Sequence, residues 1–193
     1  PNMSFTSSTT TQANTADVVI GSSNQEIIGM QVVTTNATNP FDLTQFQINM
    51  TGSTNTADVT NIDVYYTGTS STFATTTLFG SVAPGGGTLN VNGTQTLAAG
   101  TNYFWVVYDI SGSATASNVI DAQCTQITMN GGIGNKVPTA TAPAGTRPLV
   151  VISCGTTTNT FPYSEGFESG TGVWSNQTGD QRDLIRNSGG TPS

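Results

Sequence analysis

Residues 103–108 limit most strongly the folds that this chain can form. They read Tyr, Phe, Trp, Val, Val and Tyr, which are the aromatic and β-branched types that favour strands. Because side chains alternate between the two faces of a strand, this strand has no polar face. We therefore expect it in the centre of a sheet, covered on both sides. After a polar turn, residues 119–124 predict a last long strand that continues toward Met129.

Three other segments alternate apolar and polar residues with a period of two, which is typical of strands with one buried face. Glycine-rich turns separate the segments, and no 3.6-residue periodicity indicates a helix. The sequence predicts an all-β fold, an antiparallel β-sandwich of the jelly-roll or immunoglobulin-like type. The buried positions expected from this pattern are Ile28, Met30, Val32, Phe46, Ile48, Met50, Ile62, Val64 and Tyr66.

The composition changes after Gly131, where prolines and small residues become frequent. We predict a sandwich domain over residues 1–135, a Pro- and Thr-rich linker over 136–160, and an incomplete C-terminal β segment over 161–193. The linker contains one strand-like stretch, residues 149–153. Proline lacks the amide donor of a sheet ladder, so the pattern leaves open whether this stretch pairs with the sandwich or is an extended connector.

Four basic residues stand against 11 acidic ones, and the formal net charge is −7. So few cations cannot form the basic surface that binds nucleic acid phosphates or anionic lipids. No apolar run approaches the roughly 20 residues that span a bilayer. We expect neither nucleic acid as a partner nor membrane insertion.

The sequence contains no histidine, which removes Ser-His-Asp triads and histidine metal sites together. A glycosidase could still use two carboxylates about 5 to 10 Å apart. The spacing of Asp42, Asp58, Asp63, Asp109 and Asp121 suggests no such pair, so we predict that the chain is not an enzyme.

Calcium is the one cofactor that an acidic β-protein of this kind suits, because it binds carboxylate and carbonyl oxygens. Asp109 with Asp121, and Asp180 with Asp183, are the candidate ligands. The sequence has no EF-hand loop, and carboxylates solvated in turns explain the same residues without an ion.

Two cysteines, Cys124 and Cys154, are too few for a disulfide framework. They form either one bridge, which would close a loop of about 30 residues, or two separately buried thiols.

Aromatic side chains are candidates for stacking on sugar rings. Tyr65 and Tyr66 point to opposite faces of one strand, and Tyr65 is expected on the exposed face. Trp105 lies in the apolar central strand, so we expect it to pack in the core. Tyr65 is therefore the candidate glycan-binding residue.

The segment AAGTNYFWVVYDISGSATASNVIDAQC over 98–124, with EIIGMQVVTT and NIDVYYTG upstream, resembles the domain found N-terminal to BNR-repeat neuraminidases. The resemblance covers residues 1–148. Related modules are repeated in large surface proteins of Bacteroidota, so it implies export by the type IX route and an extracellular location at the bacterial cell surface. The Asp-box and arginine triad of the catalytic propeller are absent from the sequence.

Residues 161–193 resemble the start of a MAM domain, a jelly-roll adhesion module. Arg182 and Leu184 depart from the family pattern, and the stretch is far shorter than a whole MAM domain. The matching positions are Phe167, Glu168, Gly172, Trp174, Asp180, Asp183, Arg186 and Asn187.

Two functions follow as hypotheses. The first is a non-catalytic structural or adhesive module of a large bacterial surface protein or filament, such as a stalk, fibre or gliding-type adhesin. Its partners would be neighbouring copies or domains, joined by strand addition through residues 1–11 or 155–193. The alternative is a carbohydrate-binding accessory domain of a secreted sialidase-like hydrolase, with glycans as partners.

Overall fold

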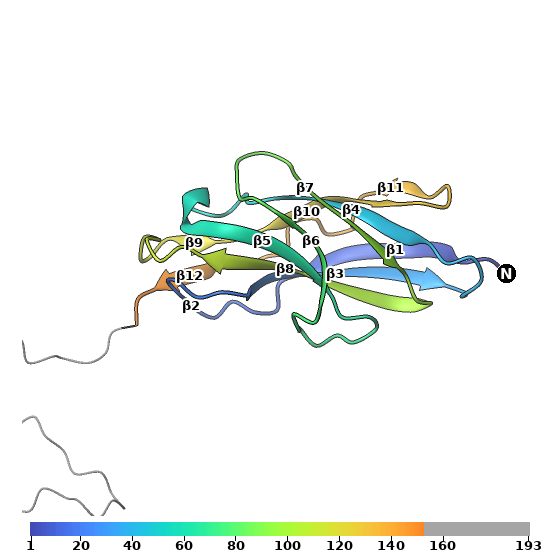
Figure 1. Ribbon diagram of the computed structural model, residues 1–193, viewed down its shortest axis with the longest axis horizontal. Helices are drawn as coiled ribbons and strands as arrows, with labels where there is room; N and C mark the ends of the chain where they lie inside the picture. The colour runs from blue at the N-terminus through green and yellow to red at the C-terminus, as the bar shows by residue number, and fades with distance from the viewer. Residues whose placement is uncertain (153–193) are drawn as a thin grey trace, which may run out of the picture. The chain divides into compact units, whose positions relative to one another are not determined.

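Two antiparallel sheets face each other in the computed structural model of the protein, which describes residues 1–152 (Figure 1). The first sheet has the order β1-β3-β8-β5-β6 and the second the order β11-β10-β4-β7. A small third sheet, β2-β12-β9, lies at one end of the sandwich. The all-β prediction is confirmed. The strands are β1 Ser4–Thr11, β2 Val18–Val19, β3 Gln25–Thr35, β4 Asp42–Asn49, β5 Val59–Tyr66, β6 Thr77–Val82, β7 Leu89–Thr96, β8 Gly100–Ile110, β9 Val119–Ile120, β10 Gln123–Met129, β11 Gly134–Lys136 and β12 Arg147–Val150, with a 3₁₀ turn η1 at Thr56–Asp58.

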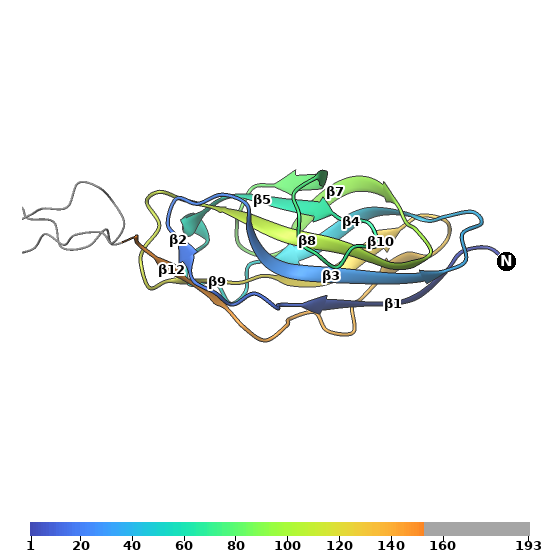
Figure 2. The same cartoon turned by 90° about the horizontal axis from the view of Figure 1, so that it is seen from below.

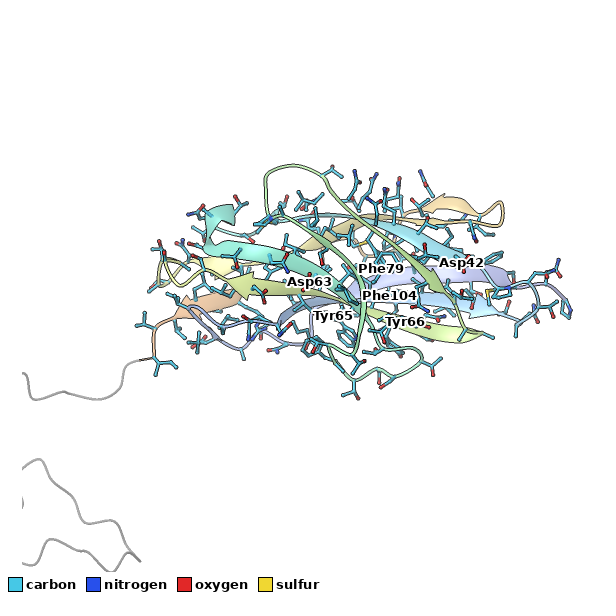
Figure 3. All side chains as sticks on the ribbon, viewed as in Figure 1. Asp42, Asp63, Tyr65, Tyr66, Phe79 and Phe104 are labelled. Carbon is cyan, nitrogen blue, oxygen red and sulfur yellow. The ribbon has the colours of Figure 1, made fainter. Side chains whose placement is uncertain are left out.

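The core lies between the two large sheets and contains the side chains that the period of two placed inside. Phe46 of β4 packs edge-on against Phe104 of β8 at 5.0 Å and against Phe79 of β6 at 5.2 Å between ring centroids. Figure 3 shows Phe79 and Phe104 near the middle of the sandwich. These edge-to-face contacts hold the two sheets together, because aromatic side chains bury large apolar surfaces. Within residues 1–152, no helix is long and apolar enough to cross a membrane.

Strand β8 is central, as its apolar sequence predicted, and pairs with β3 on one side and β5 on the other. Phe104, Val106 and Tyr108 point into the core. Trp105 is only 8% exposed but does not belong to the core cluster. Its ring lies on the outer face of the sheet, so the prediction of core packing was right about burial and wrong about the face.

Residues 119–129 form two strands rather than the one predicted. β9 pairs with β12 in the small sheet, whereas β10 pairs with β4 and β11 in the second large sheet. The break falls at Asp121 and Ala122, where the Asp121 carboxylate accepts a hydrogen bond from the Ala122 N–H at 2.8 Å. This local bond replaces a ladder partner and lets the chain change sheets.

The compact unit runs from Pro1 to Ile152 and therefore extends past the boundary predicted at residue 135. β12 returns to the sandwich and pairs in parallel with β2 and antiparallel with β9, with Leu149 fully buried. Of the two alternatives for residues 149–153, the structure thus shows pairing for Leu149 and Val150. The C-terminal segment with its MAM-like pattern lies outside the described residues.

Residues 139–141, which we call the strap, join the edges of the two large sheets. Thr139 donates its N–H to the Ser8 carbonyl of β1 at 2.8 Å, and Thr10 of β1 donates to Ala140 at 3.0 Å. Cys124 of β10 donates to the Thr141 carbonyl at 3.0 Å. In Figure 2 the segment between β11 and β12 runs beside β1. The proline-rich stretch is therefore part of the domain and not a free linker.

Candidate functional site

Strand β5 carries Asn61, Asp63 and Tyr65 on the outer face of the first sheet, because Ile62 and Val64 between them fill the core. The neighbouring strand β6 has an irregular register, in which Asp63 pairs with Ser81 but Tyr65 pairs with Leu78. The extra residue of β6 lets Phe79 turn inward and leaves Leu78 beside Tyr65, 53% exposed. We call the surface formed by Asn61, Asp63, Tyr65, Leu78 and Ser81 the β5–β6 face.

The Asp63 carboxylate has one oxygen held firmly and one held weakly. Its Oδ1 accepts hydrogen bonds from Ser81 Oγ at 2.6 Å and from Asn61 Nδ2 at 2.9 Å. From the described part of the chain, its Oδ2 accepts only a long bond of 3.3 Å from the Tyr65 hydroxyl. That length exceeds the usual range for O–H···O bonds. The carboxylate is therefore fixed in orientation and keeps acceptor capacity on Oδ2.

An aromatic base supports the face from the side of β8. Trp105 lies opposite Tyr65 in the register, and its ring lies over Gly29, where a Cβ atom would come within 3.0 Å. Tyr103 stacks on Trp105 with centroids 6.4 Å apart, and Phe73 meets it edge-on at 5.8 Å. The indole N–H donates to Thr67 Oγ1 at 2.9 Å. These contacts fix the ring beneath the loop that joins β5 to β6.

Negative charge surrounds the Tyr65 phenol. Burial raises its pKa. The Asp63 carboxylate raises the pKa further through its charge and its hydrogen bond, and the charge of Asp109 adds to this effect. The hydroxyl thus stays protonated at neutral pH and serves as a donor.

A hollow of about 560 Å³ borders the face at the loop between β5 and β6. The register joins it to the face, since Thr77 pairs with Tyr66 next to the Tyr65–Leu78 pair. Six of its eight lining residues carry a hydroxyl group, and none of the eight is charged. The lining residues are Tyr66, Thr67, Gly68, Ser70, Thr72, Ala74, Thr76 and Thr77.

The calcium candidates Asp109 and Asp121 have separate surroundings. Asp109 accepts the Asn24 N–H at 2.8 Å near the end of β8, whereas Asp121 is 9% exposed and bonds Ala122. Within residues 1–152, no three His, Cys, Asp or Glu side chains gather as metal ligands would. Asp180 and Asp183 lie outside the described residues, so calcium binding remains a prediction there.

Cys124 is fully buried, with its thiol 3.7 Å from the Gln126 carbonyl. Burial raises the pKa of the thiol to about 12. Cys154 lies outside the described residues, so the disulfide stays a prediction.

Sequence reasoning singled out Tyr65 but treated Asp63 as a carboxylate without a partner. The spacing of Asn61, Asp63 and Tyr65 could have placed all three on one face, since their positions differ by two. The contributions of Leu78 and Ser81 depend on the β6 irregularity, for which the sequence gives no signal.

The described residues define a two-sheet β-sandwich domain with one polar and aromatic face. A family model described as the N-terminal domain of BNR-repeat neuraminidase matches residues 6–132, and the chain belongs to this family. The solved structure entitled "Hadza microbial sialidase Hz136" is similar, with a TM-score of 0.55 and 13% sequence identity. The match covers 71% of this chain and 30% of that chain, and at this identity it shows a shared fold. No curated protein matches the sequence.

Proposed function

We propose that this domain is a non-catalytic, carbohydrate-binding accessory module of a secreted or surface-exposed sialidase-like protein, and that the β5–β6 face is its binding surface. The observation that carries the proposal is the arrangement of two neighbouring rows on β5 and β6. Tyr65 and Leu78 form an apolar row, and Asp63 and Ser81 form a polar row beside it. Along a strand the rows are about 7 Å apart.

This arrangement matches the two kinds of surface on a sugar ring. The C–H groups on one side of a pyranose are apolar and pack against an aromatic or aliphatic side chain. The hydroxyls at its rim need acceptors, and Asp63 Oδ2 has capacity for one, while the Oδ1 bonds from Asn61 and Ser81 keep the carboxylate in place. A fixed acceptor loses less entropy on binding than a mobile one.

The same geometry supports binding without catalysis. Glycoside cleavage uses two carboxylates on opposite sides of the scissile bond, one of which acts as an acid. Asp63 has its Oδ1 occupied by two donors on the surface of the sheet, and Asp109 is bonded to the Asn24 backbone. Neither carboxylate has a histidine to exchange protons with, because the sequence has none.

A structural role in a surface protein is the second candidate, and the covered sheet edges favour it. The strap already bonds the outer edge of β1 through Ser8 and Thr10. Identical modules held close together must avoid pairing through open edges, so a protected edge suits a repeated spacer. Strand addition at this part of β1 would have to displace the strap first.

A glycan panel read by isothermal titration tests the binding proposal on the full chain. We expect weak but saturable binding to one class of oligosaccharide, lost in Tyr65→Ala and reduced in Asp63→Asn. Asp17→Asn, which changes an exposed carboxylate in the loop before β2, is the matched control and should bind as the wild type does. Absence of binding across neutral and acidic glycans, with all variants folded, would contradict the proposal.

A further inference from the structure

The basic side chains of the described domain lie away from the β5–β6 face. Residues 1–152 contain seven acidic and only two basic side chains, Lys136 and Arg147. Arg147 is 4% exposed and donates to the backbone carbonyls of Ala16 and Glu26. Lys136 lies on β11 in the other sheet, with its Nζ 5.7 Å from the centre of the Phe5 ring. Neither cation is placed to meet a ligand at Tyr65.

The face itself is negatively charged. Asp63 lies within it, and the Asp109 carboxylate lies beside it on the neighbouring strand β8, where Asp109 pairs with Asn61. Both carboxylates act to raise the pKa of Tyr65, after the larger effect of burial. A ligand carboxylate bound here would meet like charges, and no guanidinium or ammonium group of residues 1–152 would replace its water.

The free acceptor on Asp63 also limits which chemical group of a ligand can bind beside it. Asp63 Oδ2 can accept a hydrogen bond but cannot donate one, so the ligand must bring the donor. Sugar hydroxyls provide such donors, whereas a carboxylate group offers acceptors only, so a ligand carboxylate cannot take this position.

We infer that the β5–β6 face binds neutral sugars and discriminates against glycans that end in a carboxylate-bearing sugar. This inference rests on the proposed carbohydrate-binding function. In a protein with a sialidase-like partner domain, such a face would bind the neutral sugars that are exposed on a glycan after its acidic terminal sugar has been hydrolysed off. It would not hold the acidic substrate itself.

Matched pairs of oligosaccharides test the inference, for example lactose with its sialylated form, within a panel of neutral glycans and their sialylated counterparts. We expect the full chain to bind the neutral member about threefold more tightly at low salt, since Asp63 lies about 7 Å along β5 from Tyr65 and its charge opposes the acidic member. The difference should shrink at high salt, where the repulsion is screened.

The substitution Asp109→Asn removes a negative charge near the β5–β6 face without removing the hydrogen bond that Asp109 makes. It keeps a side-chain oxygen for the Asn24 N–H, so binding of the neutral glycan should be unchanged while binding of the sialylated partner improves. Equal or tighter binding of the sialylated members by the wild type would overturn the inference and leave the proposed function standing. Failure of every glycan in the panel to bind would overturn the proposed function instead.

Discussion

Gly80 of β6 and Gly93 of β7 lie against each other's strands, where the edges of the two large sheets meet. A Cβ atom at Gly80 would collide with the carbonyl oxygen of Asn92, and one at Gly93 with that of Phe79. Both obstacles are backbone atoms, which cannot rotate aside as a flexible side chain can. The two glycines thus let β6 approach β7 closely and cover this edge of the sandwich.

Substitution of either glycine should therefore weaken the fold. We expect Gly93→Ala to lower the free energy of unfolding by about 1 to 3 kcal/mol, the cost of forcing an extra group into a packed region. Urea denaturation followed by tryptophan fluorescence measures it. Gly86→Ala is the control, because no atom lies within 4 Å of its Cβ position, and it should be close to neutral. Equal effects of the two substitutions would show that the contact is not limiting.

A buried amide at Asn102 should also contribute strongly to stability. This side chain is fully buried, accepts from the Tyr66 hydroxyl at 2.7 Å and the Ala98 N–H at 2.9 Å, and donates to the Ala98 carbonyl at 2.8 Å. We expect Asn102→Ala to cost about 3 kcal/mol, since several buried groups lose their partner at once. Tyr66→Phe, which removes one of these bonds, should cost about 1 kcal/mol in the same urea titration. A small loss in Asn102→Ala would mean that water replaces the amide.

The sequence pattern correctly predicted the features that depend only on the local pattern of apolar and polar residues. Alternation identified the inward side chains of β4 and β5, and the apolar run of β8 identified the central strand. These features depend on residues close together in the chain, so local periodicity is sufficient. The family resemblance, confirmed over residues 6–132, added the class of protein but did not point to the β5–β6 face.

The features that the sequence pattern missed depend on contacts between distant parts of the chain. The strap and β12 bond to β1 and β2, more than a hundred residues earlier, and proline-rich sequence gives no sign of such partners. The outward position of Trp105 likewise depends on a loop that covers it, because Phe73 and Thr67 take the place of a second sheet. A buried side chain therefore need not lie in the main core.

Asp121 should make stability fall as pH rises. Burial raises the pKa of this carboxyl in the folded protein, although the Ala122 N–H bond opposes the shift. The native state then retains the proton above the unfolded pKa of about 3.9, so the free energy of unfolding declines from there through the folded pKa and levels off above it. Asp121→Asn removes this titration. The stability of this variant relative to the wild type should rise over that range in urea titrations, and a constant difference between the two would contradict the prediction.

The Cys124 thiol should resist alkylation in the native state. It is fully buried with a pKa raised to about 12, so at pH 8 the thiol stays protonated and the reactive thiolate is scarce. In a Cys154→Ser variant, iodoacetamide should modify Cys124 only when denaturant unfolds the domain. Rapid native labelling would contradict the burial. For the wild type, an intact mass lower by two hydrogens would instead establish the predicted bridge to Cys154.

The strap should protect the edge of β1. Thr139→Pro removes the N–H that bonds Ser8, whereas Thr139→Val keeps that N–H and removes only the 3.0 Å side-chain bond to the same carbonyl. We expect the proline variant to lose about 1 to 3 kcal/mol, because a buried acceptor loses its donor, and the valine variant to lose less. An uncovered edge pairs with other chains. Sedimentation velocity should therefore detect concentration-dependent association of Thr139→Pro alone. If both variants remain monomeric at high concentration while the proline variant is destabilised, the strap supports the fold without guarding the edge.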